Sequence, residues 1–128
     1  MKKKEIKKYI ELNKQFNVKC EKIKKIIETL PSSSLPNYKG DIFYADYFYI
    51  ISDTNLVGWH GNDRYRGYLS GHFPIEYLSL TDEELKAIVD KKQRELREEQ
   101  LAKDAEVEKK KKEERKKLFE ELKKEFES

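Results

Sequence analysis

The chain has 128 residues, of which 28 are Lys or Arg, 25 are Asp or Glu and 37% are apolar. This length suits one small domain with an added segment. No stretch approaches the roughly 20 consecutive apolar residues of a transmembrane helix, so we expect neither a membrane span nor a membrane partner. The single cysteine, Cys20, excludes an internal disulfide and a cysteine-based zinc site, and it favours a reducing compartment, which we expect to be the cytoplasm.

Charged and aromatic residues are segregated along the chain. Residues 1–30 carry ten lysines against four glutamates, and residues 81–128 carry 15 basic and 16 acidic groups. Residues 31–80 contain eleven of the fifteen aromatic residues and only eight charged ones. The middle segment must therefore supply most of the core, and it needs an apolar helix face from a flanking segment to complete that core.

Residues 1–30 are predicted to form one helix of about 25 residues, which is followed by a loop over residues 31–40. The helix has a seam of alternating three- and four-residue spacings, typical of heptads. The seam positions are Ile6, Tyr9, Asn13, Phe16, Cys20, Ile23, Ile27 and Leu30. Either this seam packs on the chain's own sheet, or it pairs two copies as a homodimer with Asn13 fixing the register.

Residues 41–80 are predicted to form a three-stranded antiparallel meander. The expected strands are 41–52, 56–60 and 65–73, with turns at 53–55 and 61–63. Asp46 interrupts one face of the first strand or marks a bulge. The tyrosines of so small a sheet are expected to be half-buried core residues with solvated hydroxyls.

Residues 81–128 are predicted to form a long helix. Thr81 and Glu84 have the spacing of a capping box, which starts the helix at Asp82. Beyond residue 103 the segment is highly charged, and either a solvated or coiled-coil helix or a disordered tail would suit it. Near the end, Leu118, Phe119, Leu122 and Phe126 form an apolar patch that could fold back, pair with its copy or dock into a partner.

The sequence offers no evident catalytic or metal site. Cys20 lies on the helix seam, where a free cysteine acts as a small apolar residue. His60 and His72 lack the spacing of a metal-binding motif, and no glycine-rich phosphate loop is present. We therefore expect a protein that is not an enzyme and that uses no metal or other cofactor.

Binding surfaces are better represented. Three groups are expected to contact a partner protein: an aromatic and guanidinium edge, an acidic helix start and the apolar patch near the end. Their residues are Arg64, Tyr65, Arg66, Tyr68, Asp82, Glu83, Glu84, Phe119, Leu122 and Phe126. Direct nucleic-acid binding ranks second and would use the outward lysines Lys7, Lys14, Lys22 and Lys25.

A resemblance covers residues 40–128. It consists of Trp59, then Gly67-Tyr68, then residues 73–78 (FPIEYL), then residues 81–84 (TDEE) leading into a Lys/Glu-rich helix. This order resembles small accessory proteins encoded by phages and prophages of low-GC Gram-positive bacteria. Such proteins include anti-CRISPR and other counter-defence inhibitors, which are cofactor-free and occupy a surface of a host immune protein. The resemblance implies an inhibitor in the host cytoplasm, and it assigns no residue roles.

The sequence thus predicts an α+β fold with an N-terminal helix, a three-stranded antiparallel meander and a long charged C-terminal helix. The predicted segments are the helix over 1–30, the loop over 31–40, the sheet over 41–80 and the helix over 81–128. The predicted function is a non-enzymatic inhibitor that binds a host protein, such as a CRISPR-associated nuclease complex. The alternatives are a nucleic-acid-binding accessory protein and a homo-oligomeric coiled-coil scaffold.

Overall fold

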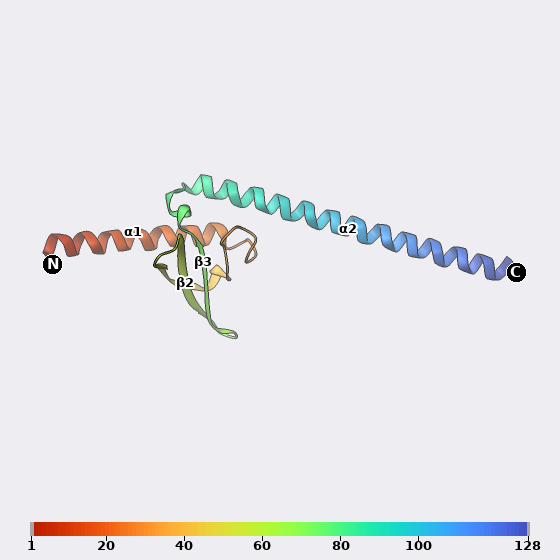
Figure 1. Cartoon of the computed structure of the whole chain (residues 1–128), viewed down its shortest axis with the longest axis horizontal. Helices are drawn as coiled ribbons and strands as arrows, with labels where there is room; N and C mark the ends of the chain where they lie inside the picture. The colour runs from red at the N-terminus through yellow and green to blue at the C-terminus, as the bar shows by residue number, and fades with distance from the viewer. Residues whose placement is uncertain (1, 128) are drawn as a thin grey trace. The chain divides into compact units, whose positions relative to one another are not determined.

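The computed structural model describes residues 2–127 and has the predicted α+β architecture (Figure 1). Two compact units make up the chain, Met1–Lys92 and Gln93–Ser128. The elements in chain order are α1 (Lys3–Ile27), the 3-10 helix η1 (Ile42–Tyr44), β1 (Ala45–Ile50), β2 (Leu56–Asp63), β3 (Gly67–Pro74), the 3-10 helix η2 (Ile75–Ser79) and α2 (Asp82–Glu127).

The sheet is an antiparallel meander in the order β1-β2-β3. A register shift between Ala45 and Tyr47 confirms the bulge predicted at Asp46. One face of the sheet, here called the inner face, carries Phe48, Trp59 and Phe73, which are all buried. The apolar side chains of the inner face form the centre of the core, as the concentration of aromatic residues in this segment predicts.

Both helices contribute to the core in the first unit. The second half of α1 buries Cys20, Ile23 and Ile27, and the first turns of α2 bury Leu85 and Val89. Two lysines of α1 also donate hydrogen bonds to backbone carbonyls of other segments of this unit. The Nζ of Lys19 donates to the carbonyl of Leu80 at 2.6 Å, and the Nζ of Lys24 donates to that of Ala45 at 2.9 Å.

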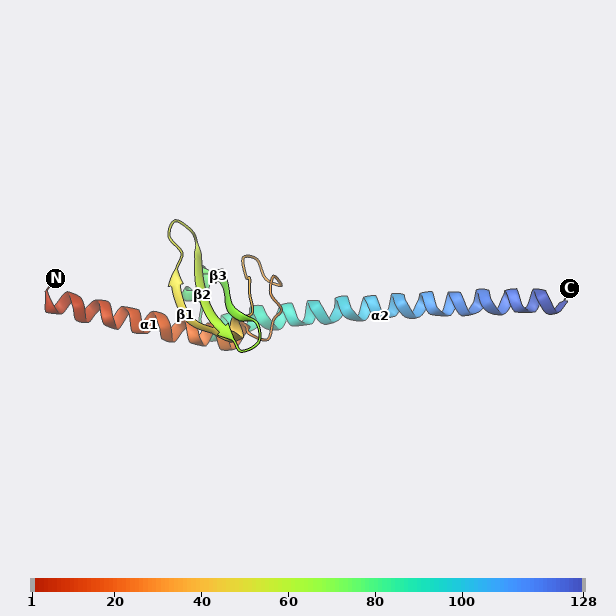
Figure 2. The same ribbon diagram turned by 90° about the horizontal axis from the view of Figure 1, so that it is seen from below.

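The first half of α1 is uncovered. Figures 1 and 2 show this half extending past the sheet, and the seam positions Ile6, Tyr9 and Asn13 are exposed there. The two halves of the seam therefore lie in different environments. Its second half packs on the chain's own sheet, as one of the two interpretations requires, whereas its first half has no covering element within residues 2–92.

The long helix begins as predicted. The backbone N–H of Glu84 donates to the Thr81 hydroxyl at 3.1 Å, and the Glu84 carboxylate accepts from the Thr81 N–H at 3.2 Å, which is the reciprocal capping box. The helix then continues to Glu127, so the charged segment adopts the helical alternative. Within it, the Nζ of Lys110 lies 3.9 Å from the Glu106 carboxylate, an i, i+4 pair that supports the helix.

Several predicted boundaries are wrong. The N-terminal helix α1 ends at Ile27 and not at Leu30, because residues 28–30 form a turn and a bend before Pro31. Residues 42–44 are 3-10 helix and not strand, so β1 begins at Ala45. Residues 61–63 are not a turn, because β2 continues through them and the chain reverses at 64–66. Gly61 lies inside β2, where a side chain would overlap the backbone of Tyr44.

The environment of Cys20 gives a measurable prediction. The side chain is fully buried, and burial raises the pKa of its thiol to about 12. An unfolded thiol ionises near pH ~8.5, so folding opposes ionisation, and the stability that Cys20 contributes is lost as the pH rises from about 8.5 towards 12. We expect the native thiol to resist a disulfide-forming reagent at mildly alkaline pH and to react after unfolding in urea. Equal reaction rates in the two states would contradict this burial.

Candidate binding surface on the open face of the sheet

The second face of the sheet carries a cluster of aromatic rings, which we call the open face cluster. Its members are Tyr47, Tyr49, His60 and Tyr68. The ring of His60 lies at the centre, with centroid distances of 4.8 Å to Tyr47, 5.7 Å to Tyr49 and 5.9 Å to Tyr68. The three tyrosines are 55%, 36% and 65% exposed, so the expectation that sheet tyrosines are half-buried core residues is wrong for these positions.

The bulge at Asp46 places these tyrosines on the open face. Neighbouring strand residues point to opposite faces, and directly paired residues share a face. Tyr47 pairs with His60 and Phe48 pairs with Trp59. Without the extra residue, the register set by the pair Ala45 and Gly61 would turn Phe48 outward and Tyr47 inward. The bulge therefore fills the core with Phe48 and presents Tyr47 and Tyr49 to solvent.

A glycine beneath the cluster lets one ring lie on the sheet. Gly58 pairs with Tyr49, and a Cβ built on Gly58 would lie 2.7 Å from Cζ of the Tyr49 ring. The ring thus occupies the space that a side chain at position 58 would take. Sequence reasoning missed this residue, although a glycine inside a strand is a known signal of close approach.

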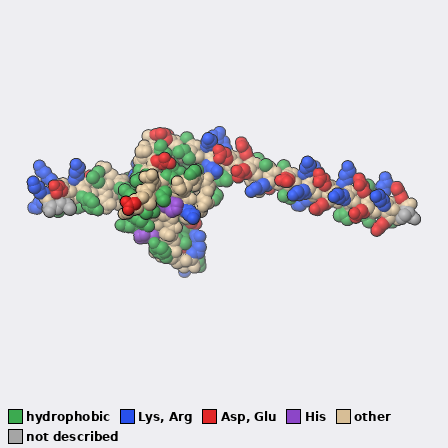
Figure 3. Space-filling model, viewed as in Figure 1, with side chains coloured by type: hydrophobic (Ala, Val, Ile, Leu, Met, Phe, Trp, Pro, Cys, Tyr) green, Lys and Arg blue, Asp and Glu red, His purple; other side chains and the backbone are tan. Residues whose placement is uncertain are grey.

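The open face extends beyond β3. Gly58 also pairs with His72, and His72 forms an isolated antiparallel bridge with Lys39 through two backbone hydrogen bonds of 2.9 Å. Lys39 and His72 thereby continue the row that starts at Tyr49. Figure 3 shows histidine side chains in purple among hydrophobic ones in green over the sheet. The position of Lys39 was not predicted, because the bridge joins residues 33 positions apart.

The hairpin between β2 and β3 carries the predicted arginine and tyrosine edge. Tyr65 is 89% exposed, and the Arg64 guanidinium lies 5.9 Å from the centroid of its ring. Arg66 has a structural role instead. It donates to Asp63 at 2.6 Å and to Asp41 at 3.1 Å. These hydrogen bonds raise the pKa of Arg66, and the bond from Arg66 lowers the pKa of Asp63.

The acidic group at the start of α2 is partly occupied by the fold. Glu84 belongs to the capping box, and Asp82 lies 3.6 Å from the Nζ of Lys19. Glu83 is exposed. Of the three predicted contact residues, two thus already have partners within the chain, so this group is a weaker candidate than the sheet.

The remaining predicted residues lie on the helices. Phe119, Leu122 and Phe126 are exposed in the second unit. The outward lysines of α1 are exposed as expected; they are Lys7, Lys14, Lys22 and Lys25. Both sets are therefore accessible to a partner.

Two further observations concern the described part of the chain. Residues 2–127 contain no group of three or more His, Cys, Asp or Glu side chains arranged to hold a metal ion. None of the helices in this range is both long and apolar enough to cross a membrane.

Comparison with known proteins yields no relative. No family model matches the chain, and neither the curated proteins nor the solved structures contain a significant match.

Proposed function

We propose that this protein acts by binding another protein through the open face cluster, without catalysing a reaction. The supporting observation is the solvent exposure of three tyrosines that surround one histidine on the sheet. Tyrosine combines a large apolar ring with a polar hydroxyl and loses little conformational freedom on binding, which makes it a frequent anchor of protein interfaces. Contiguous exposed apolar surface of this kind marks an interaction site.

The finer proposal is a phage-encoded inhibitor that blocks a host nuclease complex in the cytoplasm. Its support is the resemblance of residues 40–128 to counter-defence proteins, together with a surface suited to occupying a partner. The open face cluster and Tyr65 at the hairpin would provide the anchors. Arg64 would add a cation at the rim of the interface.

Affinity capture from nuclease-treated host lysate tests this function. We expect the tagged chain to recover an immune nuclease in stoichiometric amount and to retain it at raised salt, because apolar anchors depend little on ionic strength. The double substitution Tyr49→Ser/Tyr68→Ser should abolish recovery, since each lost anchor weakens binding by roughly tenfold or more. The control is Leu101→Ser, which removes an exposed apolar residue of α2 outside the proposed contact surfaces and should leave recovery intact.

A cleavage assay with the recovered nuclease then tests whether the chain inhibits it. Excess wild-type chain should suppress cleavage of target DNA by the purified complex, and the double variant should not. Binding without suppression would contradict inhibition, and recovery that survives loss of both tyrosines would contradict the proposed surface.

The second candidate is a nucleic-acid-binding accessory protein, and the exposed lysines of α1 favour it. Phosphate contacts release counterions, so such binding should weaken steeply as salt rises. If only nucleic acid or nucleic-acid-dependent proteins are recovered, and salt removes them, this candidate replaces the inhibitor.

A further inference from the structure

Two apolar helix surfaces remain uncovered and lie outside the open face cluster. The first, called the α1 stripe, is the first half of the seam with its neighbour Ile10; Ile6, Tyr9, Ile10 and Asn13 are exposed, and Phe16 is partly buried. The second, called the distal patch, is made of Leu118, Phe119, Leu122 and Phe126, which are all exposed. Both occupy one helical face over about three turns, so the two surfaces match in length.

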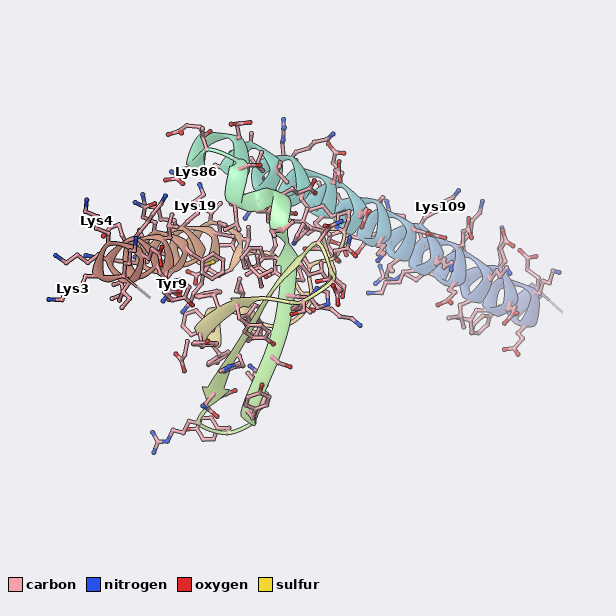
Figure 4. The ribbon with its side chains drawn as sticks, turned by 60° about the vertical axis from the view of Figure 1, so that its left-hand side comes forward. Lys3, Lys4, Tyr9, Lys19, Lys86 and Lys109 are labelled. Atoms are coloured by element: carbon pink, nitrogen blue, oxygen red, sulfur yellow. The ribbon has the colours of Figure 1, made fainter. Side chains whose placement is uncertain are left out.

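The charges around the two surfaces differ. Residues 2–19 carry seven lysines against two glutamates, whereas residues 114–127, which include the edges of the distal patch, carry five acidic and five basic groups. Figure 3 shows the blue side chains around green ones on the first part of α1, and in Figure 4 Lys3, Lys4 and Tyr9 project from this part of the helix into solvent. Pairing of two α1 stripes would bring two strongly basic segments together, whereas pairing of an α1 stripe with a distal patch would not.

The arrangement of the charges adds an orientation. On a helix with 3.6 residues per turn, Lys7 and Lys14 lie along one edge of the α1 stripe. This edge is reached by rotating about the helix axis in the direction in which the chain winds, so we say that it follows the stripe; the opposite edge precedes the stripe. Glu114 and Glu121 lie along the edge that precedes the distal patch, and both pairs are separated by seven residues. In a parallel helix pair, the edge that follows one surface lies on the same side as the edge that precedes the other.

The other edges of the two surfaces also match. Lys116 and Lys123 follow the distal patch, and Glu5 precedes the α1 stripe. A parallel pair brings these edges together as well. An antiparallel pair would place lysines against lysines on one side, so the charges favour the parallel orientation.

We propose that the chain associates with a second copy of itself, in which the α1 stripe of one copy packs in parallel against the distal patch of the other. One contact then covers both apolar surfaces. Asn13, the polar position in the stripe, would restrict the register of the pair. This inference is independent of the proposed function, because it uses the helices and leaves the open face cluster accessible.

Light scattering after size-exclusion chromatography, on the full chain over a wide range of concentrations, tests the proposal. We expect a mass above that of the monomer, as a dimer or a longer head-to-tail assembly. Ile6→Ser/Ile10→Ser and Leu122→Ser/Phe126→Ser should each raise the dissociation constant roughly tenfold or more. All four side chains are exposed, so the fold should survive these substitutions. Val18→Ser, which removes an exposed apolar residue outside the stripe, is the control and should change nothing.

Charge reversal is the decisive test of the parallel pairing. The variants Lys7→Glu/Lys14→Glu and Glu114→Lys/Glu121→Lys should each be mainly monomeric, and the chain that combines all four substitutions should associate again. Failure of the combined chain to recover would overturn the parallel pairing. A monomeric wild type at every concentration would overturn the proposal, as would association that needs the α1 stripe but not the distal patch, since that result would indicate pairing of two α1 helices.

Discussion

Alanine in place of Trp59 is expected to lower the free energy of unfolding by about 3 to 5 kcal/mol, the range for removal of a buried Trp or Phe side chain. Trp59 is fully buried at the centre of the inner face. A Cβ built on either Gly40 or Gly71 would lie 2.6 Å from Cζ2 of its indole, so two backbone segments pack directly on the ring. Removal of the ring would leave a cavity that these segments cannot fill without breaking the bridge between Lys39 and His72.

Urea unfolding followed by circular dichroism measures this effect. For a domain of this size, such a loss is a large part of the total stability, so we expect the variant to be mostly unfolded at 37 °C. Tyr65→Ala is the control, because Tyr65 is 89% exposed at the hairpin and its loss should change the stability by less than about 0.5 kcal/mol. Equal unfolding midpoints for the two variants would contradict the position of Trp59 in the core.

Gly61→Ala is the second substitution with a large expected effect. A Cβ at this position would lie 1.8 Å from the carbonyl oxygen of Tyr44, at the end of η1. No rotamer relieves an overlap with backbone, so β1 or η1 must move away from β2. We expect a loss of about 3 kcal/mol, the upper part of the usual range for overpacking, measured again by urea unfolding.

Gly58→Ala is the matched control for Gly61→Ala, because both glycines lie in β2. The added Cβ would meet the far end of the Tyr49 ring, which is partly exposed and can rotate away. We expect a much smaller change in stability but weaker partner binding through the displaced ring. If Gly58→Ala destabilised the fold as strongly as Gly61→Ala, the difference between a backbone and a side-chain obstacle would not hold.

The candidate site was only partly predictable from the sequence. Arg64, Tyr65 and Tyr68 were expected at a binding surface because their segment combines guanidinium and aromatic groups on a strand, and they are accessible. Tyr47, Tyr49, His60 and Lys39 were not expected there. Their common face depends on strand register, and a shift of one residue reverses the direction of every side chain in a strand.

Features that depend on near neighbours were predictable without the structure. The capping box at Thr81 and Glu84 joins residues three positions apart, and the seam of α1 follows from helical periodicity. Composition also located the core in the aromatic segment, since few charged residues lie there. These features need no knowledge of distant contacts, because local hydrogen bonds and the helical repeat fix them.

Which apolar surfaces are covered depends on how the elements pack together. The seam of α1 is uniform in sequence, yet Ile23 is buried and Ile6 is exposed, because the sheet packs against only the second half of the helix. The bulge at Asp46 and the bridge between Lys39 and His72 likewise decide which aromatic rings face solvent. Burial depends on contacts between residues far apart in the chain, and local patterns carry no information about where those contacts end.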